Sequence, residues 1–290
     1  MTAESSPPTL LLRDGRRLAW HEAGSARGAP VVACHGLPGS REQRYPDEGL
    51  AQRMGARVIH VDRPGFGWSD PAPHLRLRDW ALDVEQLAEH LGLDRFAVAG
   101  VSGGGPFAAA CAALLPDRVS RVALVSSVGP PASMGPPAQM HLLARFALYG
   151  AARVRWLVAP PLAMAARLAR ARPNDFIALL ARSLGPADQV VLARPHVQQM
   201  LVRDLREAFR QGAGGLVRDL ALLGSDWNLP LSRVRAPCAL WHGERDRVVP
   251  ASASARLAQE IPGSRLTLLP DAGHFFVLEH WPRILEWLLQ

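Results

Sequence analysis

A serine set among glycines is the residue of this chain best suited to covalent chemistry. Residues 100–104 read Gly-Val-Ser-Gly-Gly, which is the pattern G-x-S-x-G of a nucleophile elbow. Such an elbow is a tight turn from a strand into a helix, and it needs small residues two positions before and after the serine to avoid collisions. We therefore predict that Ser102 is a nucleophile. The pattern is short, and a plain glycine-rich turn is its alternative.

Phosphate binding is another use of a glycine-rich turn, and the sequence argues against it. A phosphate-binding loop would end in Gly-Lys-Ser or Gly-Lys-Thr, and a dinucleotide fingerprint would need G-x-G-x-x-G with an acid about 20 residues further on. Neither pattern is present, and all 33 residues counted as lysine or arginine are arginine. Hydroxyl chemistry is the favoured interpretation of the turn.

A serine hydroxyl needs a histidine to remove its proton and an acid to orient that histidine. Asp246 follows an apolar stretch at 236–243, and His274 follows another at 265–269. The chain order of serine, acid and histidine is that of α/β-type hydrolases. We predict Asp246 as the triad acid and His274 as the general base. The alternatives are that Asp246 pairs with a neighbouring arginine, that Glu244 is the working acid, or that His274 only caps the last helix.

Backbone amides that bind an oxyanion form the other half of an acyl-transfer site. Gly103, directly after the nucleophile, is one expected donor. The second should come from a loop after an early strand, and residues 35–40, which read His-Gly-Leu-Pro-Gly-Ser, follow an apolar stretch. We predict that the Leu37 amide is this donor. His35 and Gly36 are expected to support the loop, His35 through a structural hydrogen bond of its ring rather than by direct chemistry.

The elements that would position these residues alternate between strands and helices. Ser102 lies between a strand candidate at 95–99 and an uncharged helix candidate at 106–115. Another helix is predicted at 77–91, with its apolar residues on one face and its polar residues, Asp83 among them, on the other faces. Regular alternation of this kind predicts an α/β protein whose mainly parallel sheet is covered on both faces.

Residues 62–70, Asp-Arg-Pro-Gly-Phe-Gly-Trp-Ser-Asp, resemble the D-x-x-G-x-G-x-S segment of a known superfamily. With the elbow, the ordered acid and histidine, and the His-Gly loop, the chain resembles the α/β-hydrolase superfamily, in particular its lid-bearing, serine esterase-like branch. The resemblance implies the α/β-hydrolase fold, a mostly parallel eight-stranded sheet with helices on both faces and an inserted helical lid. It implies a core at 1–128 and 229–290, a lid at 129–228, and a pocket floor shaped by residues 62–70.

Differences from particular relatives narrow the activity that the resemblance implies. Epoxide hydrolases and haloalkane dehalogenases carry an aspartate where Ser102 stands, so acyl transfer is favoured here. Prolyl aminopeptidases usually have a tryptophan at the position of Gly103, and their lids offer acids for a substrate ammonium, whereas residues 145–182 are rich in arginine. We expect hydrolysis of a small or medium carboxylic ester or a lactone. An aminopeptidase or amidase, a C–C bond hydrolase and a ligand-binding receptor on the same scaffold stay open.

The predicted lid contains two helical segments, at 141–158 and 162–171. Three apolar residues nearer its end are candidates for the wall of an acyl pocket: Phe209, Leu216 and Trp227. Apolar residues on such helices more often belong to the lid's own core. We therefore favour a packing role for these three residues.

Charge and composition limit the partners to be expected. The net charge is +7, but the arginines are dispersed and form no dense block, so a nucleic acid partner is not expected. Membrane contact is not expected either, although the arginines of the lid leave contact with an anionic surface or an acidic substrate open. A homodimer also stays open.

Cysteines, histidines and the first residues bear on compartment and cofactors. Cys34, Cys111 and Cys238 lie in apolar stretches and are predicted to be reduced core residues. The chain has no apolar run of roughly 18 residues, and its first residues lack the basic and apolar parts of a signal peptide, so a cytoplasmic location is expected. The ten histidines form no metal-binding motif. We expect neither a metal nor a cofactor.

Overall fold

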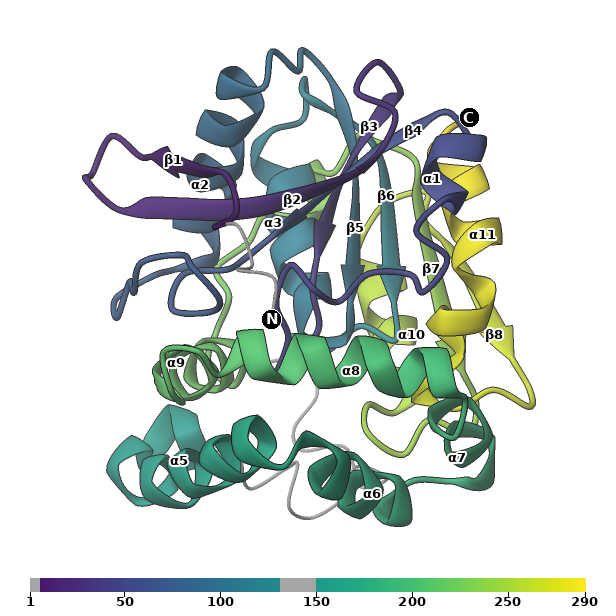
Figure 1. The fold of residues 1–290 in the computed structure, drawn as a ribbon. Coiled ribbons are helices and arrows are strands. Elements are labelled where there is room, and N and C mark those ends of the chain that lie inside the picture. The colour runs from purple at the N-terminus through teal and green to yellow at the C-terminus, as the bar shows by residue number, and fades with distance from the viewer. Residues whose placement is uncertain (1–5, 131–149) are drawn as a thin grey trace.

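The centre of the fold is a mixed sheet that is parallel over most of its width. The computed structural model describes residues 6–130 and 150–290 (Figure 1). In this part of the chain eight strands form one sheet in the order β1-β2-β4-β3-β5-β6-β7-β8. The strands are β1 (Thr9–Leu11), β2 (Arg17–Gly24), β3 (Ala29–Cys34), β4 (Ala56–Val61), β5 (Phe96–Val101), β6 (Val119–Val125), β7 (Cys238–Gly243) and β8 (Arg265–Leu269). Only the pairs β1–β2 and β2–β4 are antiparallel, so the predicted sheet is confirmed.

Helices cover both faces of this sheet, which explains why its central strands are continuously apolar. Val31 and Val32 on β3 point to opposite faces, and both are buried. Val32 belongs to the core that includes α2 (Leu77–His90), α3 (Gly105–Leu114) and α10 (Ala251–Glu260). Val31 belongs to the core on the other face, with α1 (Leu50–Arg53) and α11 (Val277–Leu288). Short 3-10 turns complete the elements: η1 (Ser102–Gly104), η2 (Leu231–Arg233) and η3 (His274–Phe276).

Helix α2 confirms the predicted amphipathic helix with one correction. Its apolar face is buried as expected, with Trp80 at its centre. Asp83, expected on an outer face, is instead buried at 2% exposure. The guanidinium of Arg16 compensates for this burial, because its two terminal nitrogens donate to the Asp83 carboxylate over 2.9 and 2.7 Å. The partner lies far away in the sequence, so helical periodicity could not reveal it.

Within residues 155–223, which lie between β6 and β7 in the chain, helices pack at the carboxyl end of the parallel strands (Figure 1). We call them the lid helices: α5 (Arg155–Ala171), α6 (Pro173–Ser183), α7 (Pro186–Leu192), α8 (Pro195–Ala208) and α9 (Gly214–Leu223). They share an apolar core, which also takes in Phe66 from the loop after β4. The division of the chain into a core and a lid at residues 129 and 228 stays a prediction.

The first lid helix differs from the two segments predicted at 141–158 and 162–171. Residues 141–149 lie outside the described residues, and 150–153 are helical. Helix α5 then runs without a break through Pro160 and Pro161. Prolines lack the amide that would bond back to the first helical turn. That turn includes Trp156 and Leu157, which are exposed, so water can hydrate its carbonyls.

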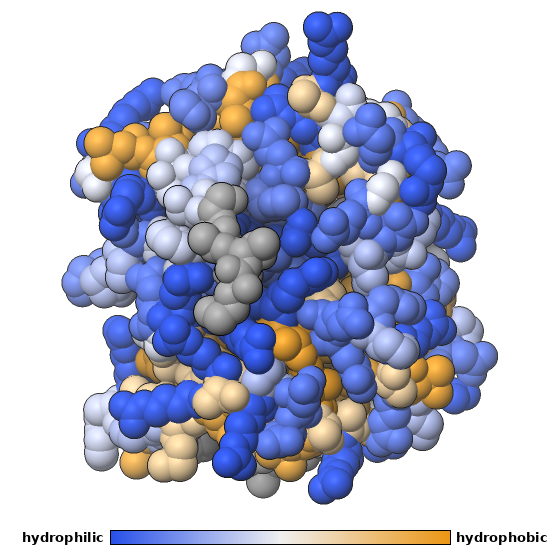
Figure 2. Space-filling model, viewed as in Figure 1, coloured by the Kyte–Doolittle hydropathy of each residue, from blue (hydrophilic) through white to orange (hydrophobic). Residues whose placement is uncertain are grey.

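The surface is mainly hydrophilic on the face seen in Figure 2, and apolar side chains interrupt it in the lower part of the view, over the lid helices. Among the exposed large apolar residues are Trp156 and Met164 of α5. None of the helices in the described part of the chain is long and apolar enough to span a membrane. Cys34, Cys111 and Cys238 are buried and unpaired, as predicted.

Candidate active site

The predicted nucleophile occupies a strained turn between β5 and α3. Ser102 has a φ of 55°, in the left-handed region that few residues other than glycine adopt. Its neighbours must be small, because a Cβ on Gly100 would lie 2.5 Å from the Gly104 carbonyl oxygen. A Cβ on Gly104 would lie 2.2 Å from the carbonyl oxygen of Cys34 on β3. The two glycines of the motif therefore let the elbow pack against its neighbouring strand and hold the serine in this conformation.

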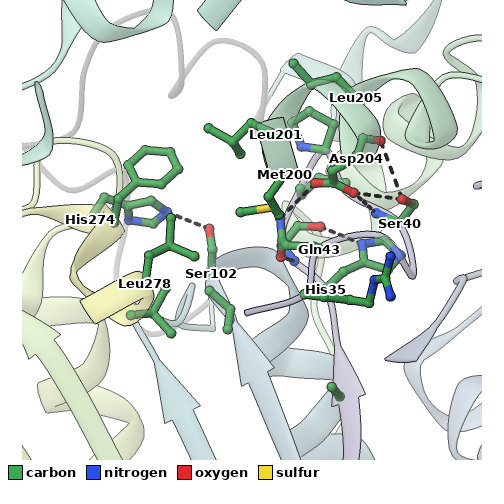
Figure 3. Close-up of a pocket in the computed structure, with 18 of the residues that line it drawn as sticks. His35, Ser40, Gln43, Ser102, Met200, Leu201, Asp204, Leu205, His274 and Leu278 are labelled. Carbon is green, nitrogen blue, oxygen red and sulfur yellow. Dashed lines mark hydrogen bonds between the residues drawn. The ribbon is translucent and has the colours of Figure 1, made fainter. Parts of the chain in front are cut away.

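Three residues that are far apart in the sequence meet at the carboxyl ends of β5, β7 and β8. His274 Nε2 lies 3.0 Å from Ser102 Oγ, and Figure 3 shows the two side chains facing one another. His274 Nδ1 lies 2.6 Å from Asp246 Oδ2. Because an ionised carboxylate only accepts, Nδ1 carries the proton and Nε2 of the neutral ring is free to accept the serine proton. This is the arrangement of a nucleophile, a general base and an orienting acid.

The structure does not support the alternatives to Asp246 as the partner of the histidine. Glu244 is exposed, and Arg245 pairs with Asp271 over 2.6 Å. Asp246 is buried, and its second oxygen accepts from the amides of Val248 and Val249 over 2.8 and 2.9 Å. These two amides fix the carboxylate and direct its other oxygen at the imidazole.

Burial and charge act in opposite directions on the acid and the base. Burial alone would raise the pKa of Asp246, but the imidazole of His274 and the hydrogen bonds it receives hold it well below its usual range. Burial alone would lower the pKa of His274, and the Asp246 carboxylate outweighs this and raises it above the ordinary value. The pair is thus arranged to stabilise the imidazolium that forms when the serine loses its proton.

His242 supports the acid and was not singled out from the sequence. Its Nε2 donates to the Val249 carbonyl over 2.9 Å and lies 3.3 Å from Asp246 Oδ2. Its Nδ1 accepts from Ser254 Oγ at 2.7 Å. The ring thus ties the loop that carries Asp246 to α10. The only signal in the sequence is a histidine four residues before the acid, at the end of an apolar strand.

The loop predicted to supply an oxyanion donor lies directly against the elbow. A Cβ on Gly103 would be 2.7 Å from Leu37 Cβ, and a Cβ on Gly36 would be 3.6 Å from Ser102 Cβ. Neither the Leu37 nor the Gly103 amide donates a hydrogen bond to any residue within 6–130 or 150–290. Both amides thus lack an acceptor among the described residues, as the prediction that they bind an oxyanion requires.

His35, expected to support this loop, forms hydrogen bonds through both ring nitrogens. Its Nδ1 donates to the Gly36 carbonyl over 2.8 Å, and its Nε2 accepts from the amide of Arg63 at 3.2 Å. Burial and the charge of Arg63 keep the pKa of His35 well below its ordinary value, so the ring is neutral. A neutral ring is what this pair of one donated and one accepted bond requires.

A cavity of about 220 Å³ opens beside Ser102 and His274. Figure 3 shows these two residues on one side of it and Ser40, Gln43 and Asp204 on the other. Its walls are mostly apolar and come from both the lid helices and the sheet. Representative wall residues are Phe176, Leu180, Met200, Leu201, Ala99 and Leu278. The site suits a small substrate with an apolar body.

The apolar residues considered as pocket candidates have packing roles. Phe209 and Leu216 belong to the core of the lid helices, and Trp227 belongs to the core on the α2 and α3 face of the sheet. The cavity is lined instead by one face each of α6 and α8. The sequence shows that these helices are amphipathic, but it cannot show which apolar residues turn toward the serine.

Asp204 of α8 lines the cavity and was not singled out from the sequence. One expectation about the pocket needs correction. Residues 62–70, expected to shape the pocket floor, lie outside the cavity wall. The segment contacts the loop at 35–40 instead of the cavity, since Arg63 donates to the carbonyls of His35 and Gly36. Within the described residues no group of three histidine, cysteine or acidic side chains is placed to hold a metal ion.

Comparison with known proteins agrees with this geometry. The family model described as the alpha/beta hydrolase fold matches residues 29–280. A 2-hydroxymuconate semialdehyde hydrolase of Pseudomonas putida is 28% identical over 290 residues, which cover 98% of this chain and 94% of the relative. A pimeloyl-[acyl-carrier protein] methyl ester esterase of Chromobacterium violaceum is 30% identical over 259 residues, with coverage of 88% and 90%. The solved structure of an alpha/beta hydrolase fold protein from Nakamurella multipartita superposes with a TM-score of 0.71 at 24% identity, with coverage of 98% and 99%.

Proposed function

The chain belongs to the α/β-hydrolase family, and on this basis we propose that it is a serine hydrolase that cleaves a small or medium carboxylic ester through an acyl-enzyme on Ser102. The observation that carries the proposal is the continuous set of contacts from Ser102 Oγ to His274 and from His274 to Asp246, at 3.0 and 2.6 Å. The apolar cavity beside Ser102 supports a substrate of small size.

The proposed reaction has two halves. Ser102 Oγ attacks the ester carbonyl while its proton moves to His274 Nε2, and the resulting oxyanion accepts hydrogen bonds from the Leu37 and Gly103 amides. Collapse of this intermediate breaks the ester C–O bond, and His274 returns the proton to the leaving alcohol. A water molecule then attacks the acyl-enzyme, gives its proton to His274, and releases the carboxylic acid and the free serine. Asp246 keeps the imidazole oriented throughout.

An ester is preferred as the substrate for two reasons. The relative from C. violaceum is named as an esterase, and it matches over most of both chains. The cavity wall is predominantly apolar around Ser102, as suits the acyl and alcohol parts of a neutral ester. A lactone needs the same groups in the same places and is included in the proposal.

Hydrolysis of a C–C bond, in a semialdehyde or a related keto acid, is the second candidate function. It is favoured by the likeness to the P. putida semialdehyde hydrolase, which extends over 98% of this chain. The two candidates use the same serine, base and acid, so the triad cannot distinguish them. Asp204 lines one end of the cavity, and an acid there could face the ammonium group of an aminoacyl amide, so this class is tested with the two candidates.

A substrate panel tests the proposal. Purified wild-type protein and Ser102→Ala are assayed on simple methyl esters and lactones, aminoacyl amides, and vinylogous keto acids. We expect the highest kcat/KM on an ester or lactone, and less than about 1% of it in Ser102→Ala, because removal of a triad nucleophile costs on the order of a millionfold. A higher kcat/KM on the keto acids than on any ester would favour C–C bond hydrolysis, the second candidate. Tight binding without turnover on any class would indicate a receptor.

A further inference from the structure

The backbone on either side of Gly36 decides where the proposed oxyanion donor points. The Leu37 amide shares a planar peptide unit with the Gly36 carbonyl, so the direction of one N–H fixes the direction of the other group. Glycine has no Cβ to restrict its backbone angles, so Gly36 alone would leave this unit free to turn. The structure supplies restraints from outside the loop on both sides of Gly36.

The carbonyl side is held by Arg63. Its Nη2 donates to the Gly36 carbonyl over 3.0 Å, and its Nη1 donates to the His35 carbonyl. The same guanidinium donates through Nε to Asp219 of α9 over 2.8 Å, with both side chains fully buried. This contact orients the peptide unit that carries the Leu37 amide.

The amide side is held by a second lid carboxylate, through Gln43. The Gly36 amide donates to Gln43 Oε1 over 2.6 Å, and Gln43 Nε2 donates to Asp204 Oδ2 over 3.2 Å. The other oxygen of Asp204 accepts from the amide and the hydroxyl of Ser40, each at 2.7 Å. Figure 3 shows this group on the side of the cavity opposite Ser102 and His274. Asp204 therefore receives bonds on both oxygens from the segment that contains the oxyanion loop.

Asp204 is buried without a counter-charge, and packing alone does not explain a carboxylate at such a position. Its side chain is 1% exposed, and within the described residues it forms no ion pair. Burial raises its pKa to about 7, although the bonds from Ser40 and Gln43 act in the opposite direction. A buried carboxylate that has hydrogen bonds but no counter-charge costs stability. A specific use for its acceptor oxygens would account for that cost.

We propose that Asp204 is a positioning residue, which acts through Gln43 to hold Gly36 so that the Leu37 amide faces the oxyanion. The proposal rests on the proposed hydrolysis at Ser102. In this proposal both the sheet and the lid helices position the oxyanion site, because the loop follows β3 whereas Asp204 lies on α8. Asp204 forms no bond to the reacting atoms in this role.

Directionality of the hydrogen bonds gives a sharp test. The asparagine of Asp204→Asn is the same size, but it offers one acceptor oxygen and one donor nitrogen. The asparagine oxygen can accept from Ser40 or from Gln43, but not from both. Its NH₂ group then faces an N–H donor of the other residue. Gln43→Glu in the same background cures this, because a carboxylate at position 43 accepts from both the Gly36 amide and the asparagine. The double variant thus restores every bond with the carboxylate moved from the lid to the loop.

Kinetics of these variants on the best ester supply the readout. For Asp204→Asn we expect kcat to fall about 10- to 100-fold, less than the roughly 100- to 1,000-fold loss of a whole oxyanion donor, with little change in KM. The inhibition constant of a trifluoromethyl ketone, which forms a tetrahedral adduct on Ser102, should rise by the same factor, while that of the matching methyl ketone stays unchanged. The double variant should recover to within about fivefold of wild type in kcat. Asp175→Asn, an exposed acid on α6, is the control.

Several results would overturn the proposal. One is a kcat of Asp204→Asn within twofold of wild type. Another is a loss confined to KM and to substrates that carry a hydroxyl or amine, which would make Asp204 a substrate contact. A double variant no better than Asp204→Asn would also contradict it. If Asp204→Asn fails to fold, Gln43→Met, which removes the same link without touching the lid, decides by the same measurements. Full activity of Ser102→Ala would instead refute the proposed hydrolysis itself.

Discussion

At the scale of single residues, the site contains two histidines whose surroundings shift their pKa values in opposite directions. The Asp246 carboxylate accepts from two backbone amides and an imidazole, and His274 keeps the proton on the nitrogen that faces this carboxylate. His35 carries the same ring but is held neutral by burial and by Arg63, with both nitrogens occupied. The proposed mechanism therefore uses His274 to transfer protons and leaves His35 to fix a loop.

The pH dependence of kcat/KM follows from the pKa of His274. In the proposed mechanism the neutral ring is the base, so we expect activity to fall as the pH drops through this pKa. Because Asp246 raises the pKa of His274 above its ordinary value of 6.5, the acid limb should lie above pH 6.5. Asp246→Asn removes the larger of the two carboxylate charges that oppose burial, so the limb should move to lower pH, while the plateau falls on the order of 10,000-fold.

Rate profiles between pH 5 and 9 check this, with Asp204→Asn as the control. Burial raises the pKa of Asp204 to about 7, so that this group titrates in the same range. The acid limb should persist in Asp204→Asn at a lower rate. A limb that disappears in this variant, or that stays in place in Asp246→Asn, would show that His274 does not set it.

At the scale of elements, the strands that carry the site were predictable and the faces of the lid helices were not. Apolar runs that end in glycine or in a polar residue marked β3, β5 and β7, because the inner strands of a parallel sheet are buried on both faces. Strand β8 lies at the edge of the sheet and is only partly buried, and the short run at 265–269 marked it. The elbow was marked by Gly100 and Gly104, whose missing side chains make room for neighbouring backbone. The burial of Asp83, Asp204 and Asp219 was missed, since each has a partner at least 67 residues away in the chain. Local periodicity contains no information about such partners.

The pair formed by Arg63 and Asp219 joins the loop after β4 to lid helix α9. We expect Asp219→Asn to lower the free energy of unfolding by about 3–5 kcal/mol, because it removes the counterion of the fully buried Arg63 and of the buried Arg218 beside it. The matched control is Asp117→Asn, which breaks an exposed aspartate–arginine pair with Arg235 at 3.8 Å and should cost less than about 1 kcal/mol. Urea unfolding of both variants measures the difference. Equal losses would show that the buried pair contributes no more than a surface pair.

At the scale of the whole molecule, function is gathered at one edge of the sheet. The strands β5, β7 and β8 end at this edge, and they bring together three residues that span 172 positions of the chain. The lid helices close the same edge and supply one wall of the cavity (Figure 1). The order of motifs in the sequence predicted the meeting of Ser102, Asp246 and His274. The shape of the cavity was not predictable, because it arises from helix faces that only the assembled fold brings together.

The central claim is that Ser102 is a nucleophile activated by His274. Intact-mass measurement after treatment with a fluorophosphonate tests it most directly, with peptide mapping and with His274→Ala as the control. The account predicts one phosphonyl adduct per chain, on Ser102, and its loss or strong slowing in His274→Ala. An unmodified wild-type protein that is folded, or an adduct that forms equally fast without His274, would contradict it.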